Sequence, residues 1–242
     1  MTAEVIVGSA PVLLLCDHAS DFVPADIALG VPDAAMRKHI AIDIGAGPLT
    51  RALAAALDAP AVLGTVSRLV IDLHREPDHP QLIPIESDGV QVPGNNGADR
   101  VDRVRRFHAP YHRLITEEVR RRRPALILAV HSFTRQLETS DDPPRPWQCG
   151  VLYNRDTRAA RPAVAWLRGE GLITGDNEPY SGRLLNATLN RHAEAQGILS
   201  LSLEVRNDLI AGAQGVASWS GILTRMVVHL RNTLASGSSS AT

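Results

Sequence analysis

Short runs of almost wholly apolar residues recur along this chain, each bounded by polar or turn-forming residues. Runs of this length are typical of strands buried on both faces of a sheet. They predict strands at residues 12–16, 61–65, 68–73, 125–130, 150–153 and 199–205. The run 125–130 is apolar throughout, so we expect a central strand that ends at His131.

Between these runs, apolar residues return every three or four positions, which is the period of an amphipathic helix. Helices are predicted at residues 33–44, 48–57, 101–122, 159–168, 184–196 and 215–234, with Asp33 capping the first and Pro48 beginning the second. The long Pro-, Gly- and Asn-rich stretch 77–97 predicts a functional loop. The alternation predicts one three-layer α/β domain over residues 1–234, with a mixed, largely parallel sheet flanked by helices, and a flexible tail at 235–242.

The composition narrows the class of protein. The 242 residues carry a formal net charge of −1, and 44% of them are hydrophobic. Proteins that bind nucleic acids or membrane surfaces usually have a basic excess, so neither partner is expected. Cys16 and Cys149 lie in apolar runs and are expected to be free and buried. The sequence shows no signal-peptide pattern and no apolar run of transmembrane length, which favours the cytoplasm.

Polar groups follow four of the predicted strands, at the edge where open α/β sheets bind ligands. The four ends are Asp17-His18-Ala19-Ser20-Asp21, Asp72-Leu73-His74-Arg75, His131-Ser132 and Glu204-Val205-Arg206. Charged groups that converge on one rim are costly unless something binds there. A metal ion explains the set, because zinc binds His nitrogen and carboxylate oxygen and uses three protein ligands at catalytic sites.

The predicted metal ligands are His18, Asp21 and His131, with a turn cap as the alternative role of Asp21. Glu204 lies in a run that should be buried. It is the predicted general base, and an internal ion pair with Arg206 is its alternative. Asp43 lies near the end of a predicted helix, where the helix dipole disfavours an acid. We expect it to orient a metal-bound histidine or to pair with an arginine, the alternative being a simple salt bridge.

His108 and His112 are four residues apart on one face of a predicted helix. This spacing suits a pair of zinc ligands, but packing beside Tyr111 is the favoured account.

Six motifs, in this order, resemble those of the N-formylglutamate amidohydrolase family. They are Cys16-Asp17-His18-Ala19-Ser20, His39 through Asp43-Ile44-Gly45-Ala46, Ser67-Arg68-Leu69-Val70-Ile71-Asp72, His131-Ser132-Phe133-Thr134, Asp176-Asn177-Glu178-Pro179-Tyr180-Ser181-Gly182 and Leu189-Asn190-Arg191-His192. The resemblance implies a zinc-carboxypeptidase-like fold with bound zinc or another divalent metal. It also implies hydrolysis of a small N-acyl amino acid with a free carboxylate, such as N-formylglutamate in histidine degradation.

The resemblance extends to substrate contacts. Arg68 and Arg75 resemble arginines that grip a substrate carboxylate, with a structural ion pair as the alternative for Arg68. Asn177 and Tyr180 lie in a polar loop that is expected to cover the site. The chain departs from the family at His74, where the usual pattern has an Asn that would contact a carboxylate, so the substrate is open.

Two other functions fit the same residues. One is a carboxypeptidase- or amidase-like hydrolase of a peptide or cell-wall fragment, and the other is a non-catalytic relative that binds a carboxylate. A deep pocket closed by the loop 77–97 favours a small substrate, whereas an open groove favours a peptide.

Overall fold

The computed structural model describes residues 3–238, in which seven strands form one mixed sheet. Their order is β1 (Ala3–Ile6), β3 (Ala61–Gly64), β2 (Val12–Cys16), β6 (Leu126–Phe133), β9 (Leu199–Arg206), β7 (Cys149–Leu152) and β8 (Thr174–Asp176). The four strands β3, β2, β6 and β9 are parallel, and β1 and the β7–β8 pair run against them. The predicted central strand is confirmed as β6, and the sheet is mixed and largely parallel as expected.

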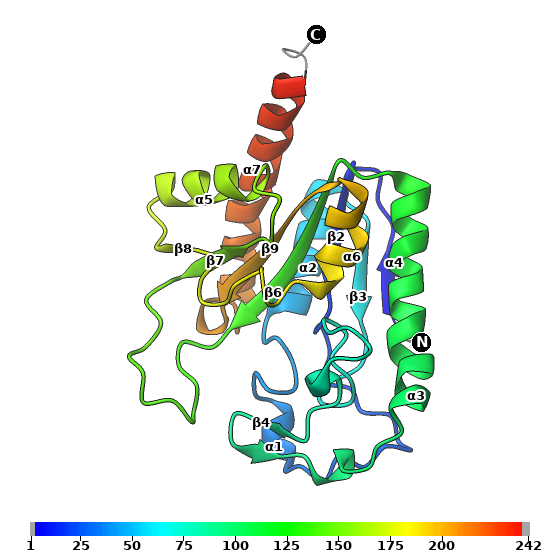
Figure 1. Ribbon diagram of the computed structural model, residues 1–242. Coiled ribbons are helices and arrows are strands. Elements are labelled where there is room, and N and C mark those ends of the chain that lie inside the picture. Colours follow the sequence, from blue (N-terminus) through cyan, green and yellow to red (C-terminus); the bar gives the residue numbers. More distant parts are fainter. Residues whose placement is uncertain (1–2, 239–242) are drawn as a thin grey trace.

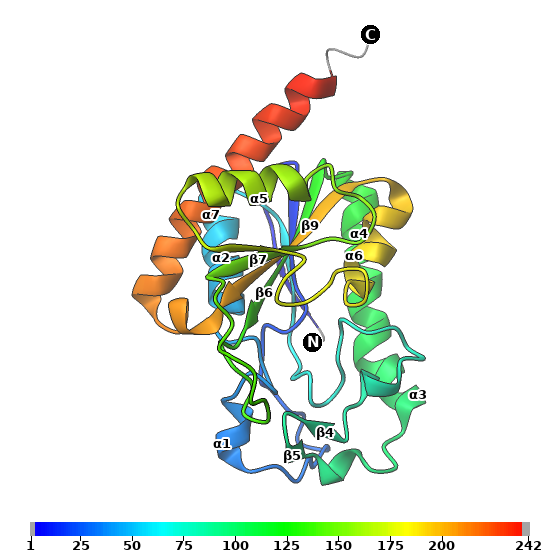
Figure 2. The same cartoon turned by 60° about the vertical axis from the view of Figure 1, so that its left-hand side comes forward.

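Helices cover both faces of this sheet (Figures 1 and 2). One face carries α2 (Ala46–Leu57), α5 (Ala160–Gly169) and α7 (Ala213–Ser238), and the other carries α4 (Ala109–Arg122) and α6 (Ala187–His192). Side chains alternate along each strand, so Leu14 of β2 joins one core while Leu13 and Leu15 join the other. Burial on both faces explains why the strands are continuous apolar runs, and the three-layer α/β architecture is confirmed.

The remaining short elements lie mostly in connections. They are α1 (Asp33–Met36), η1 (Pro80–Leu82), β4 (Glu86–Ser87), β5 (Val90–Gln91), η2 (Pro93–Asn95), α3 (Arg100–Arg103), the π turn η3 (Val104–His108), η4 (Glu194–Gln196) and η5 (Asn207–Leu209). In Figure 1 the segments with α1 and β4 lie below the carboxyl ends of β3 and β6. Among the described residues, no helix combines the length and hydropathy that a membrane span requires.

Two predicted elements are wrong. The helix expected at 33–44 ends at Met36, because the following backbone bonds to other segments: the Asp43 amide donates to the His18 carbonyl (3.1 Å) and the Arg68 amide to that of Ala41 (3.3 Å). The run 68–73 forms turns rather than a strand, since β1 occupies the open side of β3. Its apolar residues, such as Ile71, are instead fully buried in the core.

Other elements differ in their bounds. The expected helix 184–196 is divided between α6 and η4, and the helix expected at 101–122 contains the π turn just before Pro110, which has no N–H to donate. The edge strands β1 and β8 were not predicted. Helix α7 continues to Ser238 and so takes in the first part of the predicted tail, while residues 239–242 lie outside the described range.

Candidate active site

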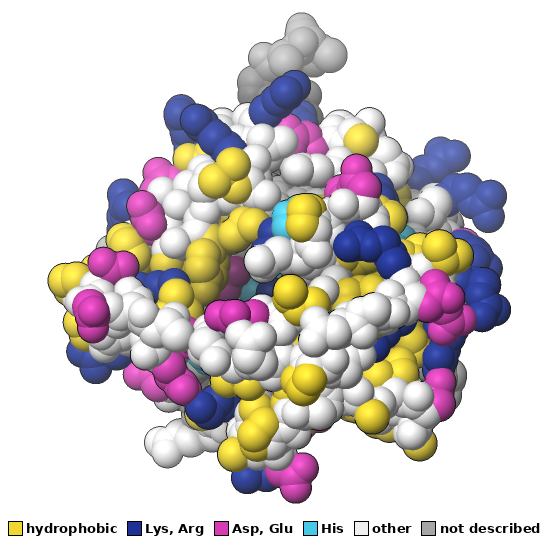
Figure 3. Space-filling model, turned by 60° about the horizontal axis from the view of Figure 1, so that its bottom comes forward, with side chains coloured by type: hydrophobic (Ala, Val, Ile, Leu, Met, Phe, Trp, Pro, Cys, Tyr) yellow, Lys and Arg dark blue, Asp and Glu magenta, His cyan; other side chains and the backbone are white. Residues whose placement is uncertain are grey.

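A cavity of about 410 Å³ lies at the carboxyl ends of β2, β6 and β9, bordered by parts of the segments 77–97 and 134–140. Figure 3 looks onto this side of the molecule and shows acidic and histidine side chains in the hollow, with hydrophobic ones beside it. The volume is within the range of small-molecule sites. Most residues singled out from the sequence line it: His18, Asp43, Arg68, Arg75, His131, Tyr180 and Glu204.

Adjacent parallel strands bring three of these side chains together. His18 lies two residues beyond β2, while His131 and Glu204 are direct partners in the paired strands β6 and β9. Asp43 reaches the same point from the irregular segment after α1. That segment passes close to Ile210: a Cβ on Gly45 (φ 80°) would lie 2.2 Å from the Ile210 carbonyl oxygen, so only glycine fits there.

His18 and His131 both turn their Nδ1 atoms toward one oxygen of Asp43. Asp43 Oδ2 lies 3.3 Å from His18 Nδ1 and 2.9 Å from His131 Nδ1. All three residues are at most 3% exposed. Their nitrogen and oxygen atoms lie within 4.8 Å of one another and are of the kinds that zinc binds.

The opposite ring nitrogens face two further carboxylates. His18 Nε2 lies 2.8 Å from Asp72 Oδ1, and His131 Nε2 lies 3.3 Å from Asp17 Oδ2. Histidines that bind a metal through one nitrogen commonly hold a carboxylate with the other, which fixes the ring and its tautomer. Both histidines therefore have the arrangement of oriented metal ligands.

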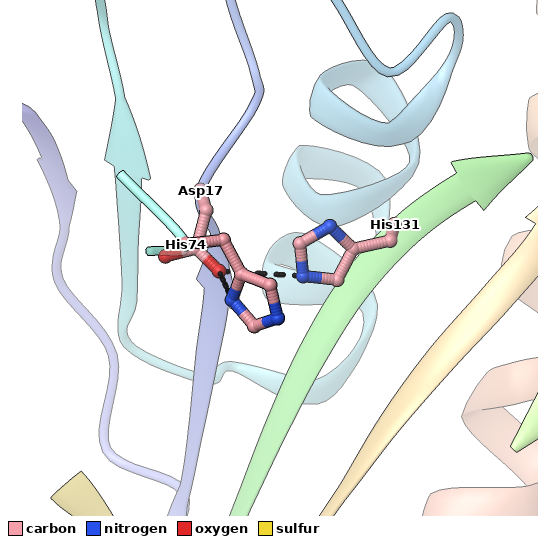
Figure 4. Close-up of side chains that lie close together, drawn as sticks. All are labelled: Asp17, His74 and His131. Carbon is pink, nitrogen blue, oxygen red and sulfur yellow. Dashed lines mark ion pairs between the residues drawn. The ribbon is translucent and has the colours of Figure 1, made fainter. Parts of the chain in front are cut away.

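A second group, Asp17, His74 and His131, also brings potential ligand atoms together. Figure 4 shows both imidazoles directed at the Asp17 carboxylate, with His74 Nδ1 at 2.9 Å from Oδ2. However, Asp17 is fully buried and is not among the residues that line the cavity. Its Oδ1 already accepts hydrogen bonds from Tyr111 (2.8 Å) and Thr188 (3.0 Å). The group with His18 and Asp43 is the one that a substrate can reach.

The charges around the two histidines fit a divalent cation. Asp17, Asp43, Asp72 and Glu204 are all buried here. Burial opposes a charged His131, yet the carboxylates of Asp17 and Asp43 raise its pKa well above the ordinary value. Burial and Arg68 oppose a charged His18, but Asp72 and Asp43 raise its pKa too. Because these carboxylates favour positive charge at both rings, they would also favour a cation bound at this point.

Glu204 differs from the other acids of the cavity. It is 6% exposed, and its Oε2 has no hydrogen-bond partner among the residues that the structure describes. Burial raises the pKa of Glu204 to about 7; His131 opposes this shift and Asp43 adds to it. The alternative pair with Arg206 is not found, since Arg206 Nε bonds to Asp208 (2.7 Å). A carboxyl group that titrates near neutrality can both take and return a proton.

The two predicted substrate arginines have different surroundings. Arg68 donates to Asp43 Oδ1 (3.0 Å) and Asp72 Oδ2 (2.9 Å), which is the structural ion pair weighed as its alternative. Arg75 approaches Asp72 only through Nε, at 3.8 Å. Within the described part of the chain, the terminal nitrogens of Arg75 have no partner and are available to a ligand, whereas those of Arg68 are bonded within the site.

Asp21 and Asn177 are not brought into the cavity. Asp21, predicted as a metal ligand, is exposed and belongs to neither group of potential ligands. Asn177 Oδ1 accepts from the amides of Tyr153 (3.0 Å) and Gly182 (3.1 Å), so it shapes the loop that carries Tyr180. That loop crosses β7 closely, because a Cβ on Gly150 would lie 1.9 Å from the Glu178 carbonyl oxygen.

The roles of Asp17 and Asp72 were missed in the sequence, although both ended predicted strands. Each follows an apolar run, and a carboxylate next to a buried run is expensive without partners. This cost of burial is the feature of the sequence that could have indicated a role for both residues.

Comparison with known proteins identifies the class. Residues 10–211 match the model of the family described as N-formylglutamate amidohydrolase. Because the match spans most of the chain, this protein belongs to the N-formylglutamate amidohydrolase family, and the resemblance of its motifs is confirmed. Membership supports hydrolase activity on amides.

Two solved structures share the fold over nearly their whole length. The gene product Atu2144 from Agrobacterium tumefaciens has a TM-score of 0.92 at 30% identity, over 97% of this chain and 96% of that one. The N-formylglutamate amidohydrolase from Ralstonia eutropha JMP134 has a TM-score of 0.72 at 19% identity, over 98% and 99%. At 19% identity, the similarity to the Ralstonia eutropha protein shows a shared fold and no more. No curated protein matches the chain significantly.

Proposed function

We propose that this protein is a metal-dependent amidohydrolase, with zinc as the expected metal, that cleaves the amide of a small N-acyl amino acid. The observation that carries the proposal is the position of Asp43 Oδ2 between the Nδ1 atoms of two buried histidines, each with a carboxylate behind it. His18, His131 and Asp43 would hold the metal, so Asp43 replaces Asp21 as the third ligand. When bound, the metal would polarise the amide carbonyl and acidify water.

The chain's own residues supply the proton transfers and the substrate grip. Glu204 takes a proton from the attacking water and returns one to the leaving nitrogen, for which its pKa of about 7 is suited. Arg75 pairs with the substrate carboxylate through its uncommitted nitrogens. Asp17 and Asp72 hold the histidine rings, and Arg68 holds Asp43 and Asp72.

The bordering segments favour a small substrate over a peptide. Gln81, Pro84, Ser87 and Asp88 of the 77–97 loop line the cavity. Asp88 also accepts from the amides of Glu138 (2.8 Å) and Thr139 (3.0 Å), which ties the two bordering segments together. A border of two joined segments supports the pocket-type alternative. A role in histidine degradation and a cytoplasmic location stay predictions.

A reconstitution experiment tests the proposal. The protein is stripped with a chelator, supplied with zinc, manganese or cobalt, and assayed against N-formyl and N-acetyl amino acids and their methyl esters. We expect activity only with metal, and faster cleavage of free acids than of esters. Full activity in a preparation shown to be metal-free by elemental analysis would contradict the proposal. A protein that binds metal and these acids without cleaving them would be the non-catalytic relative.

A further inference from the structure

The charged groups that line the cavity are unequally free to receive a substrate. Arg68 is committed to Asp43 and Asp72. His39 Nε2 lies 3.2 Å from Asp88 Oδ2, and burial lowers the pKa of His39, which disfavours its charged form. Among the described residues that line the cavity, Arg75 is the cation that keeps free donors.

Arg145 contacts Tyr180, a residue of the cavity lining, but does not itself line the cavity. Arg145 stacks on the ring of Tyr180 at 4.9 Å and donates to the Tyr180 hydroxyl (3.1 Å) and the Thr134 carbonyl (2.9 Å). Of the arginines described in the structure, Arg75 is therefore the one in the cavity lining that is free to pair with a carboxylate.

The acidic and apolar residues of the lining are unsuited to a second anion. Asp43, Asp72, Asp88 and Glu204 all face the cavity. Apolar side chains come from several different segments: Ile40, Pro84, Phe133, Leu137, Leu152 and Leu185. A carboxylate placed among such groups loses its hydration without gaining a counter-charge, whereas an apolar side chain gains from the burial.

We infer that the preferred substrate has a single carboxylate, held by Arg75, and an uncharged side chain that packs on the apolar residues of the cavity lining. The inference rests on the proposed function and narrows its substrate class. N-formylglutamate, with two carboxylates, is then a poor substrate of this member of the family.

Matched substrates test the inference. N-formylglutamate and N-formylglutamine have nearly the same size and differ in charge, and N-formylmethionine replaces the amide with an apolar group. With zinc supplied, kcat/KM for N-formylglutamine should exceed that for N-formylglutamate by on the order of tenfold or more, and N-formylmethionine should be better still. Cleavage of N-formylglutamate at least as fast as N-formylglutamine overturns the inference and leaves the proposed function intact.

A gain of function tests the cause. Leu137 is half-buried in a connecting segment that lines the cavity, so Leu137→Lys would add a cation, and Leu137→Gln is its neutral control of similar length. The lysine variant should raise the rate ratio of N-formylglutamate to N-formylglutamine at least about tenfold, and the glutamine variant should not. An unchanged ratio in Leu137→Lys overturns the assignment of the substrate side chain to the part of the cavity that Leu137 lines.

Binding separates this inference from the proposed function. Calorimetric titration of the zinc-loaded Glu204→Gln variant with the same three acids needs no turnover. Tighter binding of the two uncharged side chains supports the inference even when the wild-type protein cleaves none of the acids. Tighter binding of N-formylglutamate, or binding of none of the three, overturns it.

Discussion

Two clusters of buried or half-buried histidines lie close together in this protein but have different partners. The acid-rich cluster consists of His18, His74 and His131 with Asp17, Asp43 and Asp72. The helix cluster consists of His108 of η3, His112 of α4 and His192 of α6. In the first, carboxylates raise the pKa values of His18 and His131. In the second, burial dominates and lowers the pKa of His112 to about 2 and that of His192 to about 4.

The hydrogen-bond partners of the helix cluster are uncharged groups and not carboxylates. His112 Nε2 lies 3.0 Å from the Leu73 carbonyl and His108 Nε2 lies 2.8 Å from that of Arg75, while His112 Nδ1 contacts His192 Nε2 at 2.8 Å. A neutral imidazole meets such partners without a counter-charge. Proximity of histidines does not by itself predict a metal site; the surrounding carboxylates are what distinguish the acid-rich cluster. The favoured account of His108 and His112 as packing residues agrees with these contacts.

The helix cluster also contributes to the cavity, because it bonds to the carbonyls of the two residues on either side of His74. Its bonds to Leu73 and Arg75 anchor the turn that carries Arg75. One cluster would therefore bind the metal, and the other would position a substrate contact.

The largest contrast should come from removing one histidine of each cluster. His131→Ala should abolish metal binding and reduce activity by more than the 10- to 100-fold typical of changes behind a ligand, because it removes one of three protein ligands. His112→Ala should keep its metal. Elemental analysis of both purified variants measures this, and metal loss in His112→Ala alone would reverse the comparison.

Glu204 is the next test, because it pairs with His131 of the acid-rich cluster across the sheet, whereas the helix cluster as defined here consists of three described histidines and contains no acid. Glu204→Gln keeps the size of the side chain but cannot accept a proton, so kcat should fall by about 10² to 10⁴. Metal content and KM should change little, because the loss is confined to the transition state. Normal turnover would remove Glu204 from the mechanism, and lost metal would make it a ligand.

A smaller effect is expected from the carboxylate behind His131. Asp17→Asn should weaken zinc affinity by about 10- to 100-fold, as measured by competition with a chromogenic chelator. Tyr111→Phe removes only one hydrogen bond to the same carboxylate and serves as the control. Complete loss of metal in Asp17→Asn would instead favour the group of Asp17, His74 and His131 as the metal site.

The helix cluster should be detected in the pH dependence of stability. His192 has a pKa of about 4 in the folded protein and about 6.5 when unfolded, so between these values the unfolded chain binds the extra proton. The free energy of unfolding should therefore fall as pH drops from about 6.5 to about 4, by up to about 1.4 kcal/mol per pH unit from this residue.

The matched variant is His192→Gln. Because the pKa of Glu204 is raised, its protonation increases the free energy of unfolding as pH drops. This effect is the same in the wild type and in His192→Gln, so it cancels when their slopes are compared. Urea unfolding of the metal-free proteins at several pH values measures the two slopes. Equal slopes would show that His192 does not stay neutral in the folded chain.

The sequence predicted the parts of the fold that depend on local pattern. Compact apolar runs were enough for β2, β3, β6, β7 and β9, because strands buried on both faces need apolar residues at every position. The same pattern failed at 68–73, where the apolar residues are buried by turns packed against the core. The edge strands β1, of four residues, and β8, of three residues, are too short to show a recognisable run of apolar residues.

Taken alone, the sequence determined the family, the layered α/β architecture and the candidates His18, His131 and Glu204, because these depend on residue type and on position relative to a strand. Only the tertiary structure decided that Asp43 and not Asp21 joins the histidines. The segment that carries Asp43 packs closely against Ile210, a residue distant in sequence, and this packing places Asp43 beside the two rings. The tertiary structure also decided that Arg68 is committed while Arg75 is free, because the partners of a guanidinium are set by the segments that pack around it.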